Sequence, residues 1–150
     1  LHPESRGRLE LRSAEPHDTV KVFQNFFSVD SDIATLREGV RMARRATVQL
    51  PMDAYRGDEI DPGISVDSND ELDAWIRETA ETAHHPCCTC PMGASEMAVL
   101  DGEMKVRGTD GLRVVDGSAL PDMPSGNTNA PILMMAEKAA DMILGRRSVI

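Results

Sequence analysis

The sequence is short of cysteine, of aromatic residues, of long apolar runs and of positive charge. Its three cysteines all fall within residues 87–90, too close together for a disulfide framework, so we expect a reducing compartment. One Trp, one Tyr and three Phe leave the core to aliphatic residues and nine Met. No apolar run approaches the ~20 residues that a membrane span needs. The net charge of −9 disfavours phosphate backbones as partners, so we expect no nucleic-acid binding.

What is present indicates a globular chain with mixed secondary structure. Its 150 residues are 41% hydrophobic and 27% charged, which is typical of a folded protein. Hydrophobic periodicity predicts, in chain order, strands at residues 8–12 and 20–27, helices at 32–46 and 69–79, a short hairpin over 98–106, a strand at 112–115 and a helix at 131–144. Because strands and helices do not alternate regularly, we predict a mixed α+β fold.

The predicted helices carry start signals in the sequence. Asp30 or Ser31 suits the N-cap of the first helix, and Ser68 or Asn69 suits that of the second. We expect Pro131 at the first position of the last helix, because the N–H that proline lacks has no intrahelical partner there.

The cysteines belong to a cluster of metal- and redox-competent side chains at residues 84–93. One interpretation is a small zinc-binding or interaction module with the ligands His84, His85, Cys87 and Cys90. A second is a redox pair, since Cys87 and Cys90 have C-x-x-C spacing. A third is a tight turn in which the cysteines pack as small apolar residues. The residue types alone leave these three interpretations open.

Longer motifs resemble those of the glucose–methanol–choline (GMC) oxidoreductases, flavoproteins that oxidise alcohols. Residues 85–93 are similar to the family pattern H-P-x-G-T-C-x-M-G. Residues 114–121, 125–131 and 135–141 read V-V-D-G-S-A-L-P, S-G-N-T-N-A-P and M-A-E-K-A-A-D, and each is similar to a family segment in the same order. Residues 3–8 resemble the start of the family's C-terminal region. The resemblance therefore extends over essentially the whole chain.

Two segments resemble the choline dehydrogenase branch of this family: residues 55–63, Y-R-G-D-E-I-D-P-G, and residues 126–130, G-N-T-N-A. The resemblance implies FAD-dependent oxidation of a primary alcohol, choline to betaine aldehyde and on to betaine, with electrons passed to an acceptor such as a quinone. Cys88 stands where many members carry Gly, and Pro91 where choline dehydrogenases often carry a basic residue. A GMC dehydrogenase for another alcohol is therefore the alternative.

The resemblance also implies a catalytic pair. His85 aligns with the base that removes the hydroxyl proton, a task that suits histidine because its unperturbed pKa of ~6.5 lies near working pH. Pro86 restricts the backbone on both sides and aims the imidazole. His84 does not match the motif, and we expect it to be a solvated or packing residue. Asn127 aligns with the second catalytic position, where its amide would hold the substrate oxygen; an Asn in a turn with positive φ is the alternative.

FAD is the cofactor that the resemblance implies. Asp116 and Gly117 match the segment that passes the pyrophosphate and ribitol, although Asp-Gly is also an ordinary turn signal. Thr128, Asn129 and Ala130 match the residues whose backbone amides face the flavin ring. A helix N-terminus carries partial positive charge and free N–H groups, which suit the negative charge that a flavin gains on reduction.

The sequence has no G-x-G-x-x-G fingerprint, which in this family opens a Rossmann-type FAD domain at the N-terminus. We therefore expect a C-terminal part of a longer chain, with that missing domain as its partner. Residues 1–110 would supply part of the substrate-domain antiparallel sheet with helices, and residues 111–150 the last strand–helix unit of the FAD-binding domain. Without the partner, we expect an apolar face along residues 132–142 to be exposed. We also expect a cytoplasmic location, with any membrane association peripheral on the inner face.

Overall fold

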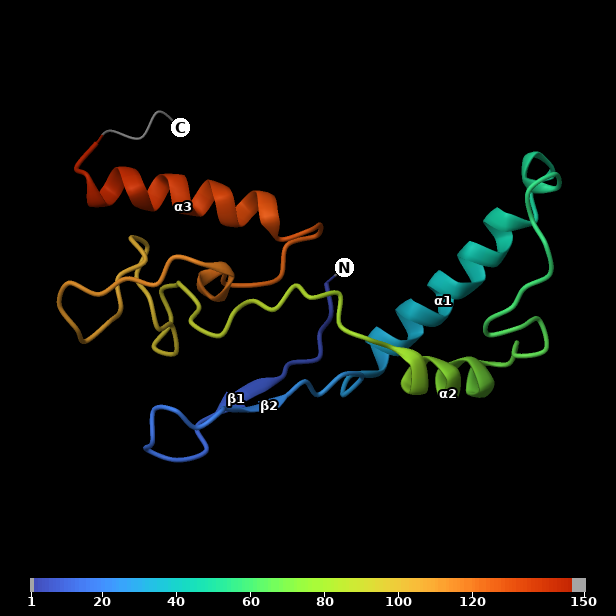
Figure 1. The fold of residues 1–150 in the computed structure, drawn as a ribbon, viewed down its shortest axis with the longest axis horizontal. Helices are drawn as coiled ribbons and strands as arrows, with labels where there is room; N and C mark the ends of the chain where they lie inside the picture. Colours follow the sequence, from blue (N-terminus) through green and yellow to red (C-terminus); the bar gives the residue numbers. More distant parts are fainter. Residues whose placement is uncertain (1, 147–150) are drawn as a thin grey trace. The chain divides into compact units, whose positions relative to one another are not determined.

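A computed structural model describes residues 2–146. The chain forms two compact units: the N-terminal unit, Glu4–Thr82, and the C-terminal unit, Ala83–Ile150 together with Leu1–Pro3. The elements in chain order are β1 (Arg8–Glu10), β2 (Lys21–Phe23), α1 (Asp30–Thr47), the 3-10 turn η1 (Leu50–Met52), α2 (Asn69–Thr79), the 3-10 turn η2 (Gly117–Ala119) and α3 (Asn129–Ile143) (Figure 1). Helices with a small antiparallel sheet confirm the predicted α+β class. The assignment of residues 1–110 and 111–150 to two domains of a longer protein stays a prediction.

The N-terminal unit begins with a short antiparallel strand pair. Arg8 of β1 lies opposite Phe23 of β2, and its guanidinium lies 4.2 Å from the centre of the Phe23 ring. Both strands are shorter than predicted, ending at Glu10 and Phe23. β2 stops because Asn25 and Phe27 have φ values of 55° and 57°, a left-handed conformation that an extended strand does not contain.

α1 covers the predicted helix, but the predicted cap is wrong. Val29 is the N-cap, and no side chain of the described residues caps this helix end. Asp30 and Ser31 lie inside the first turn instead, where the carboxylate of Asp30 faces the positive end of the helix dipole. The Ser31 hydroxyl donates to the Glu4 carboxylate at 2.9 Å, so it is used to hold the preceding segment.

A second side chain in the first turn of α1, the carboxylate of Asp32, also holds that segment. Asp32 accepts the backbone N–H groups of Glu4 and Ser5, each at 2.8 Å. A hydrogen bond from the Ser5 side chain, together with these N–H groups, holds the pKa of Asp32 below its usual range. Folding therefore favours the ionised form of this carboxyl.

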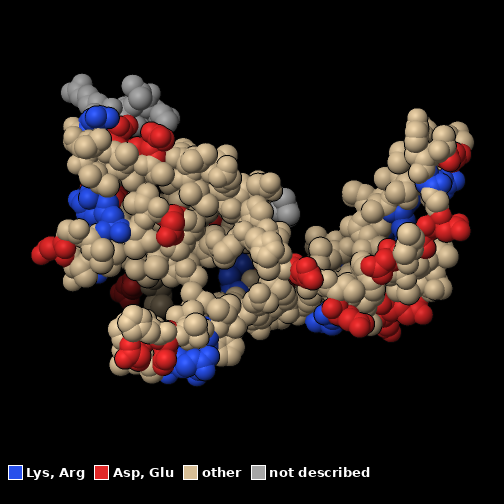
Figure 2. Space-filling view, in the orientation of Figure 1, with Lys and Arg blue, Asp and Glu red and all other residues tan. Residues whose placement is uncertain are grey.

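α2 begins where the sequence predicts. The Ser68 hydroxyl accepts the Glu71 backbone N–H at 3.3 Å, and the Glu71 carboxylate accepts the Ser68 backbone N–H at 3.1 Å, which is a capping box. Leu72 and Ile76 are buried, and this face of α2 packs on α1. The opposite face is acidic, and Figure 2 shows red side chains gathered over this helix.

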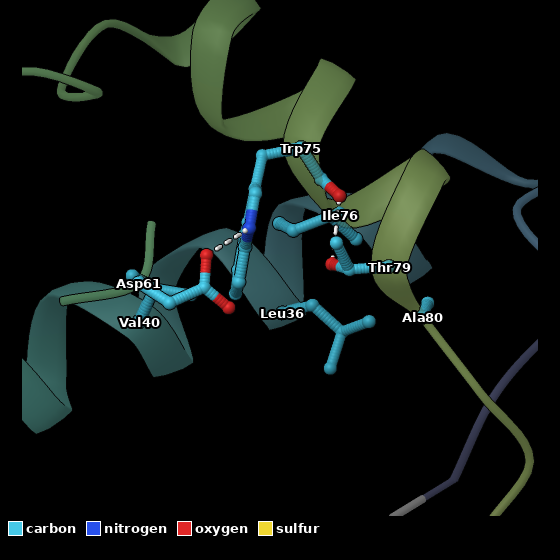
Figure 3. Close-up of a pocket in the computed structure, with 7 residues that line it drawn as sticks. All are labelled: Leu36, Val40, Asp61, Trp75, Ile76, Thr79 and Ala80. Carbon is cyan, nitrogen blue, oxygen red and sulfur yellow. Dashed lines mark hydrogen bonds between the residues drawn. The ribbon is translucent and has the colours of Figure 1, made fainter. Parts of the chain in front are cut away.

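A pocket of about 350 Å³ lies between α1 and α2 (Figure 3). It is lined by Leu36, Val40, Asp61, Trp75, Ile76, Thr79 and Ala80. The Trp75 indole N–H points at Asp61 and donates to its Oδ1 at 2.9 Å. All of these residues belong to the N-terminal unit, whereas the site residues predicted from the sequence begin at His85.

Regular strands are missing from the described residues of the C-terminal unit. Isolated bridges join Met92 to Leu100, Leu100 to Val106 and Lys105 to Arg113. The hairpin predicted over residues 98–106 is thus reduced to a single bridge, and the strand predicted at 112–115 is wrong. The physical reason is backbone turning: Met104, Gly108 and Gly111 have φ values of 60°, 76° and 72°, which interrupt an extended ladder.

α3 closes the core of this unit. Its Met135 and Ala139 belong to a buried cluster with Leu100, Met104, Ala119 and Leu120. The prediction that the apolar face along residues 132–142 lies exposed is therefore wrong for Met135 and Ala139, while Leu133 is 58% exposed. The irregular segments of the unit cover Met135 and Ala139.

The start of α3 also differs from the prediction. The helix begins at Asn129, so Pro131 is its third residue and not its first. Proline is still tolerated there, because N–H groups of the first turn have no intrahelical acceptor. No helix within residues 2–146 is long and apolar enough to cross a membrane.

Candidate active site

The His-Pro motif lies on an irregular loop of the C-terminal unit. His84 and Cys88 have φ values of 57° and 68°, so the chain turns on both sides of His85 and Pro86. His85 is half-buried, and its Nδ1 contacts the carbonyl oxygen of Ala83. Since a carbonyl oxygen can only accept a hydrogen bond, this contact is a hydrogen bond in the tautomer whose proton is on Nδ1 and whose lone pair is on Nε2. The contact thus distinguishes the two ring nitrogens: Nδ1 is engaged by the loop backbone, and Nε2 is not part of it.

This loop runs beside the turn that holds Asp116 and Gly117. Three backbone hydrogen bonds join the two segments: Cys88 N–H to Gly117 O at 3.3 Å, Cys90 N–H to Ser118 O at 3.0 Å and Met92 N–H to Ala119 O at 3.0 Å. They fix the His85 loop against η2 without a regular strand on either side. Two motifs that are separate in sequence thus form one local structure.

The start of α3, which contains the third motif, meets the His85 loop and the Asp116–Gly117 turn at Gly117. This glycine is buried, and a Cβ built on it would lie 3.1 Å from Cδ1 of Ile132 and 3.3 Å from the carbonyl oxygen of Pro86. Ile132 is in the first turns of α3. Glycine suits this close approach, because one carbon atom more would press on the His-Pro loop and on α3 together.

Asp116 has a structural task in this arrangement. As the N-cap of η2, its Oδ1 accepts the backbone N–H of Ser118 at 2.8 Å and also the Ser118 hydroxyl. The interpretation of Asp116-Gly117 as a turn is therefore confirmed as far as the backbone goes. The side chain is exposed, so the turn still presents a surface to which a bound group has access.

The first turn of α3 has the character of an anion- or carbonyl-binding site. Thr128 is the N-cap and only 8% exposed, yet no side chain within the described part of the chain caps this end. The turn contains no acidic residue, and Asn129 and Ala130 are exposed. The backbone N–H groups of Asn129 and Ala130 can therefore donate hydrogen bonds to an acceptor on a bound molecule. This fits the electron-rich edge of a flavin, which needs hydrogen-bond donors and a positive potential.

The two residues of the predicted catalytic pair belong to the same unit but are not bonded to each other. Asn127 is exposed, immediately before the N-cap of α3. Among the hydrogen bonds of residues 2–146, none links its amide to the imidazole of His85. Their roles at a common substrate stay predictions. In the chain, His85 immediately precedes Pro86, whose carbonyl oxygen approaches Gly117, and Asn127 immediately precedes the N-cap of α3.

The cysteines of this loop do not form a metal site with the neighbouring histidines. In the described residues, no three His, Cys, Asp or Glu side chains converge in a way that would hold a metal ion. Cys87, Cys88 and Cys90 are half-buried and pack against the hydrophobic cluster under α3. This supports the packing interpretation, although none of the three is fully buried.

The motif of residues 55–63 lies in the N-terminal unit, where an arginine of α1 organises it. The Arg44 guanidinium binds the Glu59 carboxylate at 2.7 Å and donates to the backbone carbonyls of Gly63 and Val66 at 3.1 and 2.9 Å. The Glu59 hydrogen bond raises the pKa of Arg44 above its usual value. The glutamate of the motif therefore fixes a loop that has no regular structure.

Sequence reasoning missed both the Ala83 contact and the Gly117 packing. The Ala83 contact leaves no pattern because it uses a backbone carbonyl, which every residue has. The Gly117 packing leaves none because Pro86 and Ile132 are distant from Gly117 in the chain. The one available signal was the glycine in D-G-S, which marks a turn but does not say what approaches it.

Comparison with known proteins shows the family of the chain. The sequence model of the GMC oxidoreductase family matches residues 3–136. The chain belongs to the GMC oxidoreductase family. It is 50% identical over 143 residues to an oxygen-dependent choline dehydrogenase of Pseudomonas fluorescens (strain SBW25), covering 95% of this chain and 25% of that protein. It is 49% identical over 147 residues to one of Vibrio vulnificus (strain YJ016), covering 97% and 26%.

Solved structures of the family are similar over almost the whole chain. Pyridoxine 4-oxidase from Mesorbium loti has a TM-score of 0.90 at 29% identity, covering 98% of this chain and 29% of that one. An FAD-dependent oxidoreductase from Chaetomium thermophilum has a TM-score of 0.90 at 31% identity, covering 97% and 25%. The GMC proteins are FAD-dependent flavoproteins, so the cofactor expected from the resemblance is that of the family. The chain spans about a quarter of the length of the curated relatives that it matches.

Proposed function

We propose that the protein containing this chain oxidises a primary alcohol with FAD, and that its substrate is choline, converted to betaine aldehyde. The observation that carries the proposal is the single local structure made by the His85 loop, the Gly117 turn and the first turn of α3. The names of the two bacterial relatives, oxygen-dependent choline dehydrogenase, support choline as the substrate.

In this proposal His85 removes the hydroxyl proton. The contact between Nδ1 and the Ala83 carbonyl leaves the Nε2 lone pair to accept it. The same carbonyl stabilises the positive charge that the ring then carries. Loss of the proton places negative charge on the substrate oxygen, which promotes departure of hydride from the adjacent carbon.

Asn127 has a positioning task. Its side-chain NH₂ group donates a hydrogen bond to the substrate oxygen, which stabilises the negative charge that develops there. An amide does not titrate in the working pH range, so it cannot replace His85 as the base. The pair thus divides proton removal and charge stabilisation between two side chains.

FAD, when bound, supplies the acceptor for the hydride. The backbone N–H groups of Asn129 and Ala130 are the donors that would hold its ring, with Thr128 fixing the start of α3. The turn at Asp116 and Gly117 would pass its ribitol and pyrophosphate. The first turn of α3 contains no acidic residue, so nothing there opposes the negative charge of a reduced flavin ring.

An anaerobic visible spectrum of the full-length protein tests this function. Flavin bands that bleach on addition of choline are the expected result. Bleaching with another primary alcohol, but not with choline, would keep the chemistry and replace the substrate. A protein that neither copurifies with flavin nor binds added FAD would contradict the proposal.

The electron acceptor is a separate part of the proposal. The resemblance favours a quinone as the electron acceptor, whereas both relatives are named oxygen-dependent choline dehydrogenase. Oxygen consumption and quinone reduction by the full-length protein, measured side by side with choline, separate the two. The cytoplasmic location with peripheral membrane association stays a prediction, which fractionation of cells before and after a salt wash would test.

A further inference from the structure

Cys87 and Cys88 are adjacent thiols that the proposed alcohol oxidation does not use. Their sulfur atoms lie 3.1 Å apart. The contact joins Cys87 to its immediate neighbour and not to Cys90, its partner in the C-x-x-C spacing. Both side chains are half-buried, so each keeps some exposed surface in this chain.

The backbone explains why two neighbouring side chains meet. In extended chain, successive side chains point to opposite sides. Cys88 instead has a φ of 68°, a left-handed turn that brings its side chain round to that of Cys87. The same residue donates its backbone N–H to the Gly117 carbonyl at 3.3 Å. The thiol pair and the anchor of the His85 loop therefore share one residue.

We propose that Cys87 and Cys88 are a redox pair that hydrogen peroxide closes into a disulfide, and that closure displaces the His85 loop and lowers turnover. Closure of the pair is independent of the function proposed above. Only its effect on turnover rests on that function.

The oxidation balances with peroxide as the oxidant. The thiolate of one cysteine attacks an oxygen of hydrogen peroxide, the O–O bond breaks, and a sulfenic acid forms while the other oxygen leaves as water. The second thiol then attacks that sulfur, the S–O bond breaks and a second water leaves. In sum, the two thiols lose two electrons and two protons, and one peroxide becomes two waters.

Closure has a mechanical consequence in this loop. Neighbouring Cα atoms are about 3.8 Å apart across a trans peptide, below the ~4.4–6.8 Å usual for a disulfide. The new bond therefore strains the peptide between Cys87 and Cys88 and draws the Cys88 N–H away from the Gly117 carbonyl. Such a strained disulfide is also easily reduced, so we expect the change to be reversible.

The test uses the full-length protein, reduced with dithiothreitol, freed of it and titrated with hydrogen peroxide. Remaining thiols are alkylated, and the peptide containing residues 87–90 is mapped by mass spectrometry while choline oxidation is followed in parallel. We expect this peptide to lose two hydrogen atoms with Cys90 still alkylated, and turnover to fall several-fold and return with dithiothreitol. Cys87→Ser should keep its basal turnover and lose the reversible inhibition, whereas the matched Cys90→Ser should respond like the parent protein.

A bridge from Cys90 to either neighbour, or sulfinic acid without a bridge, would overturn the proposed pair. A Cys87–Cys88 bridge with unchanged turnover would overturn the effect on His85 and leave the pair standing. If the protein oxidises no alcohol, the mapping alone decides the pair, so failure of the two proposals is distinguishable. The mapping of the parent protein also decides it if Cys87→Ser does not fold.

Discussion

The two units of this chain obtain their order from different sources. The N-terminal unit relies on regular elements with local signals, such as the Ser68 capping box, and on ion pairs such as that of Arg44 with Glu59 at 2.7 Å. The C-terminal unit has irregular backbone under a single long helix, held by hydrogen bonds between distant segments, such as Cys90 N–H to Ser118 O. The unit with less regular structure contains every residue of the predicted site.

This difference has a physical basis. A site that presents an imidazole, a tight glycine turn and a free helix N-terminus together needs backbone directions that neither a helix nor a strand offers. Left-handed residues such as His84 and Cys88 supply those directions, and buried packing under α3 holds them. The N-terminal unit contains the strands β1 and β2 and the helices α1 and α2, with capping and ion pairing. It contains none of the predicted catalytic residues.

The largest effect is expected at His85. His85→Ala in the full-length protein should slow flavin reduction by choline by about 10²–10⁴-fold, the usual contribution of a general base. Stopped-flow absorbance under anaerobic conditions measures this rate. His84→Ala is the matched control and should react at close to the parent rate. Equal losses in the two variants would show that the loop matters and the particular imidazole does not.

Gly117→Ala should affect both stability and rate. The added Cβ would meet the Pro86 carbonyl oxygen at 3.3 Å, a backbone atom that cannot rotate away. We expect a loss of about 1–3 kcal/mol in unfolding free energy, as for an overpacked core, together with slower flavin reduction. Gly102→Ala is the control, because nothing lies within 4 Å of a Cβ there. Parent-like denaturant midpoints and rates for both variants would separate Gly117 from the site.

Ser68→Ala should change stability alone. Loss of the hydroxyl that accepts the Glu71 N–H removes an N-cap, which costs about 1 kcal/mol. Flavin reduction should stay at the parent rate, because α2 carries no predicted site residue. Denaturant unfolding and stopped-flow rates, measured on the same preparation, check both halves of this prediction. A reduced rate would contradict the division of roles between the units.

The smallest effect concerns pH. The pKa of Asp32 is lowered from 3.8, chiefly by its hydrogen bond with the Ser5 side chain, so its contribution to stability is complete above pH 3.8 and lost as pH falls through the lower folded-state value. Unfolding free energy should therefore decline with acidification in that window, and Asp32→Asn should flatten the decline. Asp30→Asn, a neighbour in the same turn, is the control. An unchanged slope in Asp32→Asn would contradict this assignment.

A structural feature could be predicted from the sequence when the residues that cause it lie close together in the chain. The Ser68 cap and the helix that follows it were predicted because their signals lie within four residues. The early end of β2 was not, since nothing in an apolar run shows that Asn25 and Phe27 turn left-handed. The strand expected at residues 112–115 failed for the same reason, with turns at Gly108 and Gly111.

The site shows the same limit. Motif resemblance predicted the family and named His85 and Gly117 as site residues, but resemblance carries no distances. The pairing of Cys88 with Gly117 joins residues far apart in the chain, and the contact of His85 with Ala83 involves a backbone carbonyl, which every residue has. The first of these contacts is set by the packed tertiary structure and the second by the local course of the loop, and no residue pattern encodes either.

The central claim is that the His85 loop, the Gly117 turn and the start of α3 form one flavin site. Hydrogen–deuterium exchange of the full-length protein, with FAD bound and after its removal, tests this most directly. We expect FAD to protect peptides covering residues 84–92 and 115–132 far more than peptides from α1 and α2. Protection centred on α1 or α2, with residues 115–132 unchanged, would contradict it.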